Sequence, residues 1–191
     1  MQPLAEELVK KLLKWYLVCD TSTISNLENL GKLLSVYLPT SNIKVAITAE
    51  TEKEIRLKSI KNLIVRGFIS LVRPKNKAFY ITEIRRIQRI LNTRKGLGEI
   101  SSYVFVKNHK KVILVSDDML ILELQKRFGI VSSFGSLLLL YLFRMSNHLD
   151  DRKLKNQYEI LKSKVGSRVL SFNLSSLSEL DKDFVRKLLS E

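Results

Sequence analysis

Two aspartates directly follow apolar runs that are typical of buried strands. Asp20 ends the run at residues 15–19, and Asp117, with Asp118 beside it, comes just after the run at 112–115. Sequence that favours a helix start follows each of them, so each also has the simpler interpretation of a helix N-cap. Because the carboxyl ends of parallel strands meet at one edge of a sheet, we expect these aspartates to lie together at that edge.

Two glutamates are placed to join the aspartates. Glu54 lies in the first turns of the helix expected after a further apolar run at residues 43–47, although Glu50, one helical turn earlier, is an alternative on the same face. Glu99 begins another predicted helix and is the only acid in residues 84–115. Solvated helix positions are the simpler interpretation of both glutamates.

Clustered carboxylates of this kind predict a divalent-metal site. Carboxylates within about 4–6 Å of one another repel and have raised pKa values unless a cation lies between them. Oxygen ligands without a nearby His or Cys suit Mg²⁺ or Mn²⁺ and argue against zinc. Such a cation activates water and stabilises the leaving oxygen in phosphodiester hydrolysis.

The positive charge is concentrated in the middle of the chain. The 191 residues include 33 Lys and Arg against 19 Asp and Glu, a net charge of +14, and residues 55–111 alone carry +13. A lysine-rich solvated surface usually mixes both signs, which this segment does not, and an anionic membrane surface is the less favoured partner. Nucleic acid is the expected partner. The predicted phosphate contacts are Arg85, Arg86, Arg89, Arg94 and Lys95.

Apolar runs alternate with segments of helical periodicity along most of the chain. This alternation predicts an α/β fold with a parallel sheet that helices cover on both faces. The expected strands are 15–19, 43–47, 68–72, 112–115 and a short one near 130–131. The expected helices are 4–14, one that ends at Pro39, 48–65, 81–91, 99–107, one that ends near 127, and 135–145. Polar helices at 151–165 and 177–189, joined by the Ser-rich piece 171–178, then form a tail that packs back or mediates association.

Several classes of protein are excluded by composition. One Cys (Cys19) and two His (His109 and His148) allow neither an intramolecular disulfide nor a Cys/His zinc site of the usual spacing. Phosphate-binding Gly-rich motifs of kinases and dehydrogenases are missing. The longest uncharged stretch, residues 128–143, is shorter than a membrane span and is interpreted as core. Without a secretory signal pattern, a cytoplasmic location is expected.

Taken together, these segments resemble the PIN-domain nucleases. The resemblance covers residues 15–146 and is carried by five pieces in the family's order: YLVCDTSTISNL, ITAETEKEI, GLGEISSYVFVKN, VILVSDDMLILELQKRFGI and SSFGSLLLLY. They correspond to a strand ending in Asp, a helix with an early Glu, a Gly-x-x-Glu helix opening, a strand followed by two Asp, and a short strand leading into a last helix.

The resemblance implies an α/β/α sandwich at residues 1–146, followed by a helical extension at 147–191. It further implies cleavage of single-stranded or structured RNA, in the manner of toxin nucleases that have a cognate antitoxin and commonly form homodimers. Mg²⁺ or Mn²⁺ would be bound by Asp20, Glu54, Glu99 and Asp117, with Asp118 assisting and with Ser22 and Ser116 orienting ligands or waters.

Other functions remain open at this stage. The main alternative is a PIN-like module that binds nucleic acid through the basic segment 55–111 without cleaving it. Receiver and Toprim-type domains also gather acids at strand ends, but the first needs an acid pair near Asp20 and the second an Asp-x-Asp. A scaffold that acts through its C-terminal helices is a third alternative.

Overall fold

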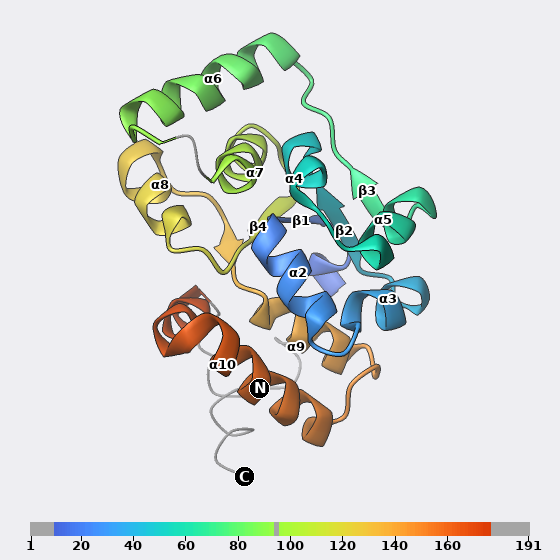
Figure 1. The fold of residues 1–191 in the computed structure, drawn as a ribbon. Coiled ribbons are helices and arrows are strands. Elements are labelled where there is room, and N and C mark those ends of the chain that lie inside the picture. Colours follow the sequence, from blue (N-terminus) through green and yellow to red (C-terminus); the bar gives the residue numbers. More distant parts are fainter. Residues whose placement is uncertain (1–9, 94–95, 177–191) are drawn as a thin grey trace.

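The centre of the fold is a parallel sheet of five short strands (Figure 1). The structure, a computed structural model, describes residues 10–93 and 96–176. The strands are β1 (Tyr16–Cys19), β2 (Lys44–Ile47), β3 (Ile69–Leu71), β4 (Val112–Val115) and β5 (Ser133–Phe134), in the order β3-β2-β1-β4-β5. All pairs are parallel, so the carboxyl ends of the strands face one edge.

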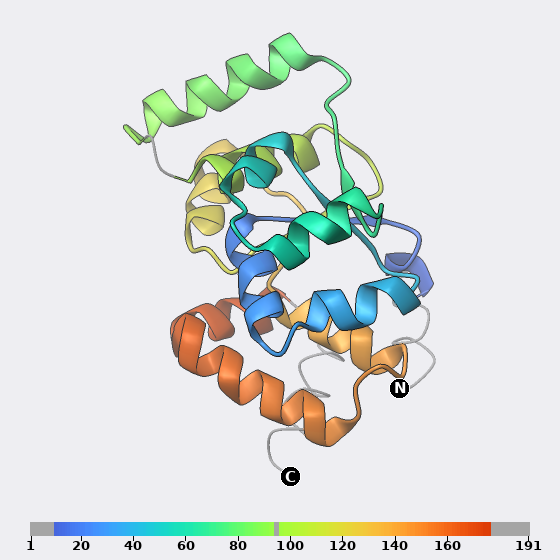
Figure 2. The same cartoon turned by 45° about the vertical axis from the view of Figure 1, so that its right-hand side comes forward.

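Helices cover both faces of this sheet (Figures 1 and 2). They are α2 (Thr21–Asn29), α3 (Leu33–Tyr37), α4 (Ala49–Glu54), α5 (Lys58–Val65), α6 (Lys77–Ile90), α7 (Leu97–Lys107), α8 (Leu120–Phe128), α9 (Leu137–Met145) and α10 (Asp151–Ser176), with a 3₁₀ turn η1 (Leu38–Thr40). One apolar cluster joins the sheet to α2, α3, α5, α9 and α10, and a second joins it to α6, α7 and α8. The predicted α/β class and α/β/α layering are confirmed.

The strands are apolar throughout because both of their faces are buried. Leu17 and Cys19 of β1 point into the larger cluster, whereas Val18 points into the smaller one. The same alternation holds along β4, where Leu114 belongs to the smaller cluster and its two neighbours to the larger. Continuous apolar runs are expected when helices cover both sides of a parallel sheet.

Two of the predicted long helices are each divided into two. The helix expected to run to Pro39 ends at Asn29, because Gly31 and Lys32 adopt left-handed backbone angles with φ of 88° and 60°. The helix expected over residues 48–65 ends at Glu54, and the chain continues through extended backbone before α5 begins. Apolar periodicity continues across both breaks, so it could not reveal them.

The prediction of a strand near residues 130–131 was wrong. The last strand is Ser133–Phe134, and Ile130 is 89% exposed. The Ser-rich piece also differs from its prediction, because α10 continues to Ser176, with a kink at Gly166, where φ is 80°. The expected helix at 177–189 and most of that at 4–14 lie outside the described residues.

The C-terminal helix packs back onto the sheet domain. α10 lies against α9, and Leu154, Leu161 and Leu170 belong to the larger core cluster (Figure 2). The ammonium of Lys164 also donates to the carbonyl of Asn29 at 3.3 Å. Residues 151–170 therefore contribute to the same core as the sheet. Within the described ranges, no helix has the length and apolar character needed to cross a membrane.

Candidate functional site

Asp20 is fully buried at the end of β1 and organises the start of α2. Its Oδ1 accepts hydrogen bonds from the Thr23 amide at 2.7 Å and the Ser22 hydroxyl at 3.0 Å, and its Oδ2 accepts from the Ser116 hydroxyl. Burial raises the pKa of Asp20 to about 6, and the charge of Asp117 adds to this, although the hydrogen bonds from Ser116 and Thr23 oppose it. Asp20 is thus the N-cap of α2 and a carboxylate whose charge the protein stabilises incompletely.

Ser116 and Ser136 hold the acids that follow β4. Besides donating to Asp20, the Ser116 hydroxyl accepts from the amide of Asp118 at 3.1 Å. Oδ1 of the buried Asp117 accepts from both the amide and the hydroxyl of Ser136, each at 2.9 Å. The hydroxyls thereby fix the acids from β1 and β4 relative to one another.

Glu54 reaches the same edge from the end of α4. Its Oε2 accepts from the Thr21 hydroxyl at 2.5 Å, and its Oε1 accepts from the backbone amide of Gly98 at 3.2 Å. Glu50, the alternative second acid, instead accepts a hydrogen bond at 3.1 Å from the hydroxyl of Tyr80 on α6. The structure therefore brings Glu54, and not Glu50, to the start of α2 and α7.

Gly98 makes the position of Glu54 possible. A Cβ atom at residue 98 would lie 2.6 Å from Oε2 of Glu54 and 3.0 Å from Oγ1 of Thr21. The first distance is shorter than a Cβ contact can be and the second is unusually tight, so any larger residue would displace the carboxylate. The glycine before Glu99 is thus a steric requirement of the site rather than a general helix-opening signal.

Glu99 is a buried acid that lies within the electrostatic influence of acids from other elements. It lies in the first turn of α7 and is 8% exposed. Burial raises its pKa to about 7, and the negative charges of Asp20, Asp118 and Glu54 raise it further. The charges of three other predicted acids, each from a different part of the chain, therefore act on Glu99.

A line of small hydroxyl side chains fixes α4 against α7. Thr48 lies 2.7 Å from Ser101 and 3.0 Å from Thr51, hydroxyl to hydroxyl, and the hydroxyls of Thr51 and Ser102 are 3.5 Å apart. All four residues are buried. Their small size allows the two helices that carry Glu54 and Glu99 to approach closely, so this interface positions both glutamates.

The chemistry of this donor set fits a hard divalent cation, although the acids are not gathered around one point. In residues 10–93 and 96–176, no group of three or more His, Cys, Asp or Glu side chains is arranged closely enough to hold one metal ion. The acids are held by hydroxyl and amide donors instead. Nevertheless, Asp20 and Glu99 are buried carboxylates whose pKa is raised in part by neighbouring negative charge, and a Mg²⁺ or Mn²⁺ ion relieves such repulsion.

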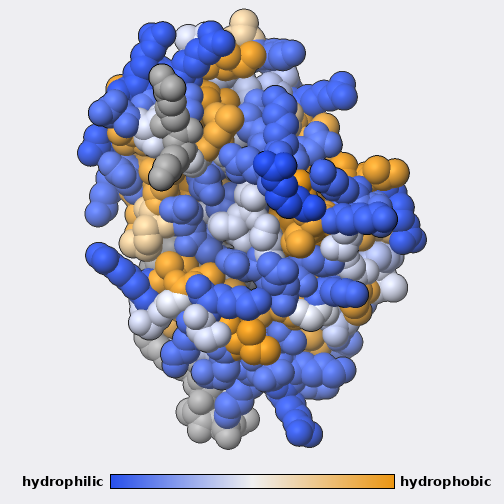
Figure 3. Space-filling view, viewed as in Figure 1, coloured by the Kyte–Doolittle hydropathy of each residue, from blue (hydrophilic) through white to orange (hydrophobic). Residues whose placement is uncertain are grey.

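The basic segment forms an exposed surface along α6. Arg85 and Arg89 are exposed there and, with Gln88, Asn92 and Thr93, line a shallow hollow of about 420 Å³. Figure 3 shows hydrophilic side chains projecting from the surface over α6. Arg94 and Lys95, which were predicted to extend this surface, lie outside the described residues.

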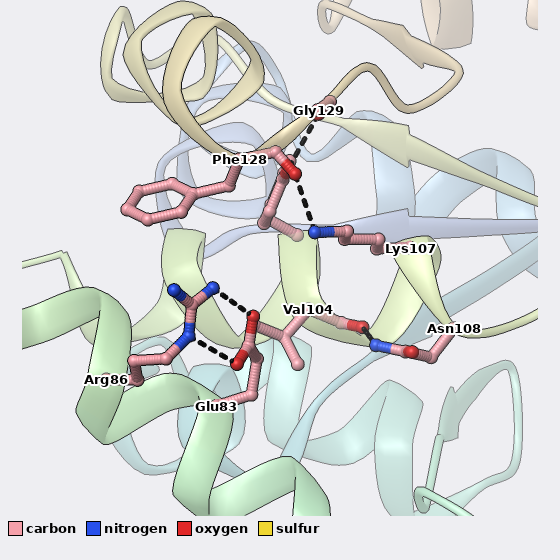
Figure 4. A network of polar contacts seen from close by, with 8 residues as sticks. Glu83, Arg86, Val104, Lys107, Asn108, Phe128 and Gly129 are labelled. Carbon is pink, nitrogen blue, oxygen red and sulfur yellow. Dashed lines mark hydrogen bonds and ion pairs between the residues drawn. The ribbon is translucent and has the colours of Figure 1, made fainter.

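Arg86 differs from the other arginines of α6. Its guanidinium makes two hydrogen bonds, each 2.7 Å long, to the carboxylate of Glu83, and it lies over the ring of Phe128 (Figure 4). This arrangement joins α6 to the end of α8, where Lys107 also donates to the carbonyl of Phe128. Arg86 therefore has a structural contact that Arg85 and Arg89 are not shown to make, while its role in phosphate binding stays a prediction.

Three residues of the site were not singled out from the sequence. Thr21, Gly98 and Ser136 occur in the sequence analysis only as members of the pieces YLVCDTSTISNL, GLGEISSYVFVKN and SSFGSLLLLY. Each contacts an acid that lies 19 to 44 positions away in the chain. Periodicity carries no information on such distant pairs, so only the fold reveals them.

Comparisons with known proteins identify no family for this chain. A scan against protein-family models, a search of curated proteins and a search of solved structures each found no match for the chain.

Proposed function

We propose that this chain is a metal-dependent endoribonuclease with a PIN-like site. The observation that carries the proposal is the electrostatic environment of two buried acids: burial raises the pKa of both Asp20 and Glu99. The charge of Asp117 raises the pKa of Asp20 further, and the charges of Asp20, Asp118 and Glu54 raise that of Glu99. Carboxylates with strongly perturbed pKa values at the carboxyl edge of a parallel sheet are typical of a functional site.

The proposed metal is Mg²⁺ or Mn²⁺, bound by Asp20, Glu99 and Asp117. Asp118 assists and Glu54 completes the site. When bound, such an ion supplies activation of water and stabilisation of the leaving oxygen in phosphodiester hydrolysis. The carboxylates must move closer together to share the ion, because no three of the described acids share one point in the structure.

The remaining residues of the site act on the acids. Ser22 and Ser116 hold the two oxygens of Asp20 in fixed directions. Thr21 and the Gly98 amide do the same for Glu54, each contacting a different oxygen. Such contacts to metal-binding side chains orient them and keep their lone pairs directed at the site.

The proposed substrate is RNA, single-stranded or structured. Exposed Arg85 and Arg89 on α6 would contact its phosphates, since clustered arginines gain affinity by releasing counterions. Cytoplasmic location, an antitoxin-like protein partner and a homodimer belong to the same proposal, through the resemblance to toxin nucleases.

A second candidate is a PIN-like module that binds nucleic acid without cleaving it. The arrangement of the acids favours it, because the carboxylates of Asp20, Glu54 and Asp117 already accept hydrogen bonds from protein donors and no three of the described acids meet. In this case the protein would only bind nucleic acid, through the basic surface along α6.

Cleavage of labelled single-stranded RNA distinguishes the two candidates. We expect cutting with Mg²⁺ or Mn²⁺, none with EDTA, and at least a 100-fold loss in Asp20→Asn. Asp150→Asn is the matched control, because Asp150 is an exposed N-terminal capping residue of α10 and Asn also caps well. Tight RNA binding without cutting under either metal, unchanged in Asp20→Asn, would establish the binding module instead.

A further inference from the structure

A pocket of about 330 Å³ opens at the same edge of the sheet as the acids. It lies between the end of β3, the start of α4 and the start of α6. Its wall continues the sheet, because the amide of Val72 donates to the carbonyl of Ile47 at 2.9 Å, beyond the last residue of β3. The volume is at the small end of the range of about 300–1,000 Å³ found for ligand pockets.

The lining of the pocket is apolar with charges at its rim. Val72, Pro74 and Ile81 contribute apolar surface, with the mostly buried Tyr80 behind them, whereas Arg73 and Lys77 are exposed cations at the same opening. Apolar walls suit a nucleobase, and cations beside them suit the phosphates on either side of it. The pocket thus combines the two features that hold one nucleotide of a single strand.

One acid is among the residues that line the pocket. Glu50 lines it, and its carboxylate accepts a hydrogen bond at 3.1 Å from the Tyr80 hydroxyl, which also lies 3.2 Å from the carbonyl of Ser101. These contacts fix Glu50 between α4, α6 and α7. Glu54 follows four residues later on α4, so the two Cβ atoms are about 6 Å apart, and a base beside Glu50 would leave its phosphate near the acids of the site.

A carboxylate selects among the bases because it only accepts hydrogen bonds. Guanine presents two adjacent donors, N1–H and the N2 amino group, which match the two oxygens of a carboxylate. Adenine and cytosine each place a ring acceptor next to their amino donor, and uracil places an acceptor on each side of its single donor. Pairing with Glu50 would therefore favour guanine.

We propose that this pocket binds a guanine base of single-stranded RNA next to the cleaved phosphate, with Glu50 reading its N1–H and N2 amino edge. The inference rests on the proposed function for its substrate class, but binding of a guanine-containing strand can be measured without cleavage.

The test uses fluorescence anisotropy of the full chain in EDTA with labelled twelve-residue oligouridine probes. One probe is all uridine, and the others carry a single central guanosine, inosine or adenosine. We expect the guanosine probe to bind at least fivefold more tightly than all-uridine, with inosine in between because it lacks the N2 amino group. Adenosine should gain at most twofold, since a discriminating bidentate contact is lost.

Two Glu→Gln substitutions provide the test variant and its control. Glu50→Gln keeps the size of the side chain and an acceptor for Tyr80, but replaces one acceptor by a donor, so it should reduce the guanosine preference to less than twofold. Glu52→Gln changes the same residue type on the same helix, outside the pocket, and should keep the preference. Circular dichroism melts of both variants check that they remain folded.

The outcomes separate this proposal from the nuclease proposal. Equal binding of all four probes, no binding of any, or a guanosine preference that survives in Glu50→Gln would overturn the base pocket, whatever the cleavage assay shows. A guanosine preference that depends on Glu50 supports it even when no metal produces cutting. Displacement of the guanosine probe by micromolar guanosine 5′-monophosphate would show a site for the free nucleotide and overturn the RNA assignment.

Discussion

Glu99 and Asp20 are buried carboxylates whose ionisation near neutral pH reduces the stability of the folded protein. Their pKa values of about 7 and about 6 mean that, near neutral pH, the folded chain holds negative charge that the unfolded chain would solvate better. Structural carboxylates are normally arranged the opposite way, as Glu83 is beside Arg86, which lowers the pKa of that carboxyl. The cost is therefore expected to be offset by function.

Removing one of these charges should stabilise the metal-free protein while abolishing its activity. Glu99→Gln keeps the shape of the side chain but cannot ionise, so at pH 7.5 we expect the free energy of unfolding to rise by about 1–2 kcal/mol. RNA cleavage should fall at least 100-fold. Thermal or urea unfolding in EDTA and the cleavage assay measure the two effects.

Glu123→Gln on α8 is the matched control for this variant, because Glu123 is exposed and pairs with Arg127. It should change stability by no more than about 0.5 kcal/mol and leave cleavage unchanged. A Glu99→Gln protein that is less stable than wild type at pH 7.5 would show that the carboxylate is a structural group.

Gly98 offers a steric test of the position of Glu54. Gly98→Ala places a Cβ 2.6 Å from Oε2 of Glu54, so the carboxylate must move and lose the Gly98 amide. We expect cleavage to fall about 10- to 100-fold, since small displacements of catalytic groups are costly. The double variant Gly98→Ala, Glu54→Asp shortens the acid and should recover part of the loss. Full activity in Gly98→Ala would contradict the role given to Glu54.

At the scale of elements, the two faces of the site come from different parts of the chain. β1 and β4 present the aspartates, and α4 and α7 present the glutamates through an interface of hydroxyl side chains. α6 packs on the outer side of α7 (Figure 2), and its Arg85 and Arg89 are exposed. The arrangement separates the proposed chemistry from the proposed binding of the RNA backbone, so the two can be tested independently.

The arginines of α6 should set RNA affinity and its dependence on salt. In Arg85→Ala, Arg89→Ala, two phosphate contacts are lost, so the slope of log affinity against log salt should become shallower by about 1.4. Affinity at low salt should fall about 10-fold or more. Arg127→Ala on α8 removes one exposed arginine that pairs with Glu123, and it should have little effect. Unchanged slopes in the double variant would exclude α6 from the interface.

The elements that could be predicted from the sequence are those with a local signal. β4 was predicted at its observed bounds because four apolar residues stand between polar ones. The apolar pattern placed β5 too early, near residues 130–131, because β5 is two residues long and is defined by backbone pairing to β4, not by apolar side chains. Only the family resemblance predicted a short strand within SSFGSLLLLY. The break at Gly31 and Lys32 depends on left-handed backbone angles that the periodicity does not record.

The residues of the site also divide into those with a local sequence signal and those without one. The aspartates could be predicted because a strand that ends in Asp places the acid at the carboxyl edge, whatever the rest of the fold does. The choice between Glu50 and Glu54 could not be made from the sequence, because the two residues are one helical turn apart on the same face. It was decided by Thr21 and Gly98 on one side and Tyr80 on the other, which are distant in sequence.

Over the whole molecule, the buried acids predict how stability depends on pH and metal. Both pKa values are raised in the folded state, so their contribution to stability is fully present below about pH 4 and is lost as pH rises through about 6 and 7. A cation that pairs with the ionised acids should restore the stability that is lost at higher pH.

We therefore expect Mn²⁺ at millimolar concentration to raise the melting temperature by several degrees at pH 7.5 and by less than one degree at pH 5. Differential scanning fluorimetry at both pH values, with Ca²⁺ and K⁺ salts at matched ionic strength, measures the effect. Equal shifts at the two pH values would mean that the ion acts elsewhere on the surface.

The most direct test of the account is a titration of the full chain with Mn²⁺, followed by electron paramagnetic resonance of the free ion at pH 7.5. We expect wild type to remove about one equivalent of Mn²⁺ from solution, and Asp20→Asn, Glu99→Gln to remove at least tenfold less at the same concentrations. If wild type binds no Mn²⁺ up to millimolar levels, or the double variant binds it equally well, these acids are not a metal centre and the proposed nuclease chemistry fails.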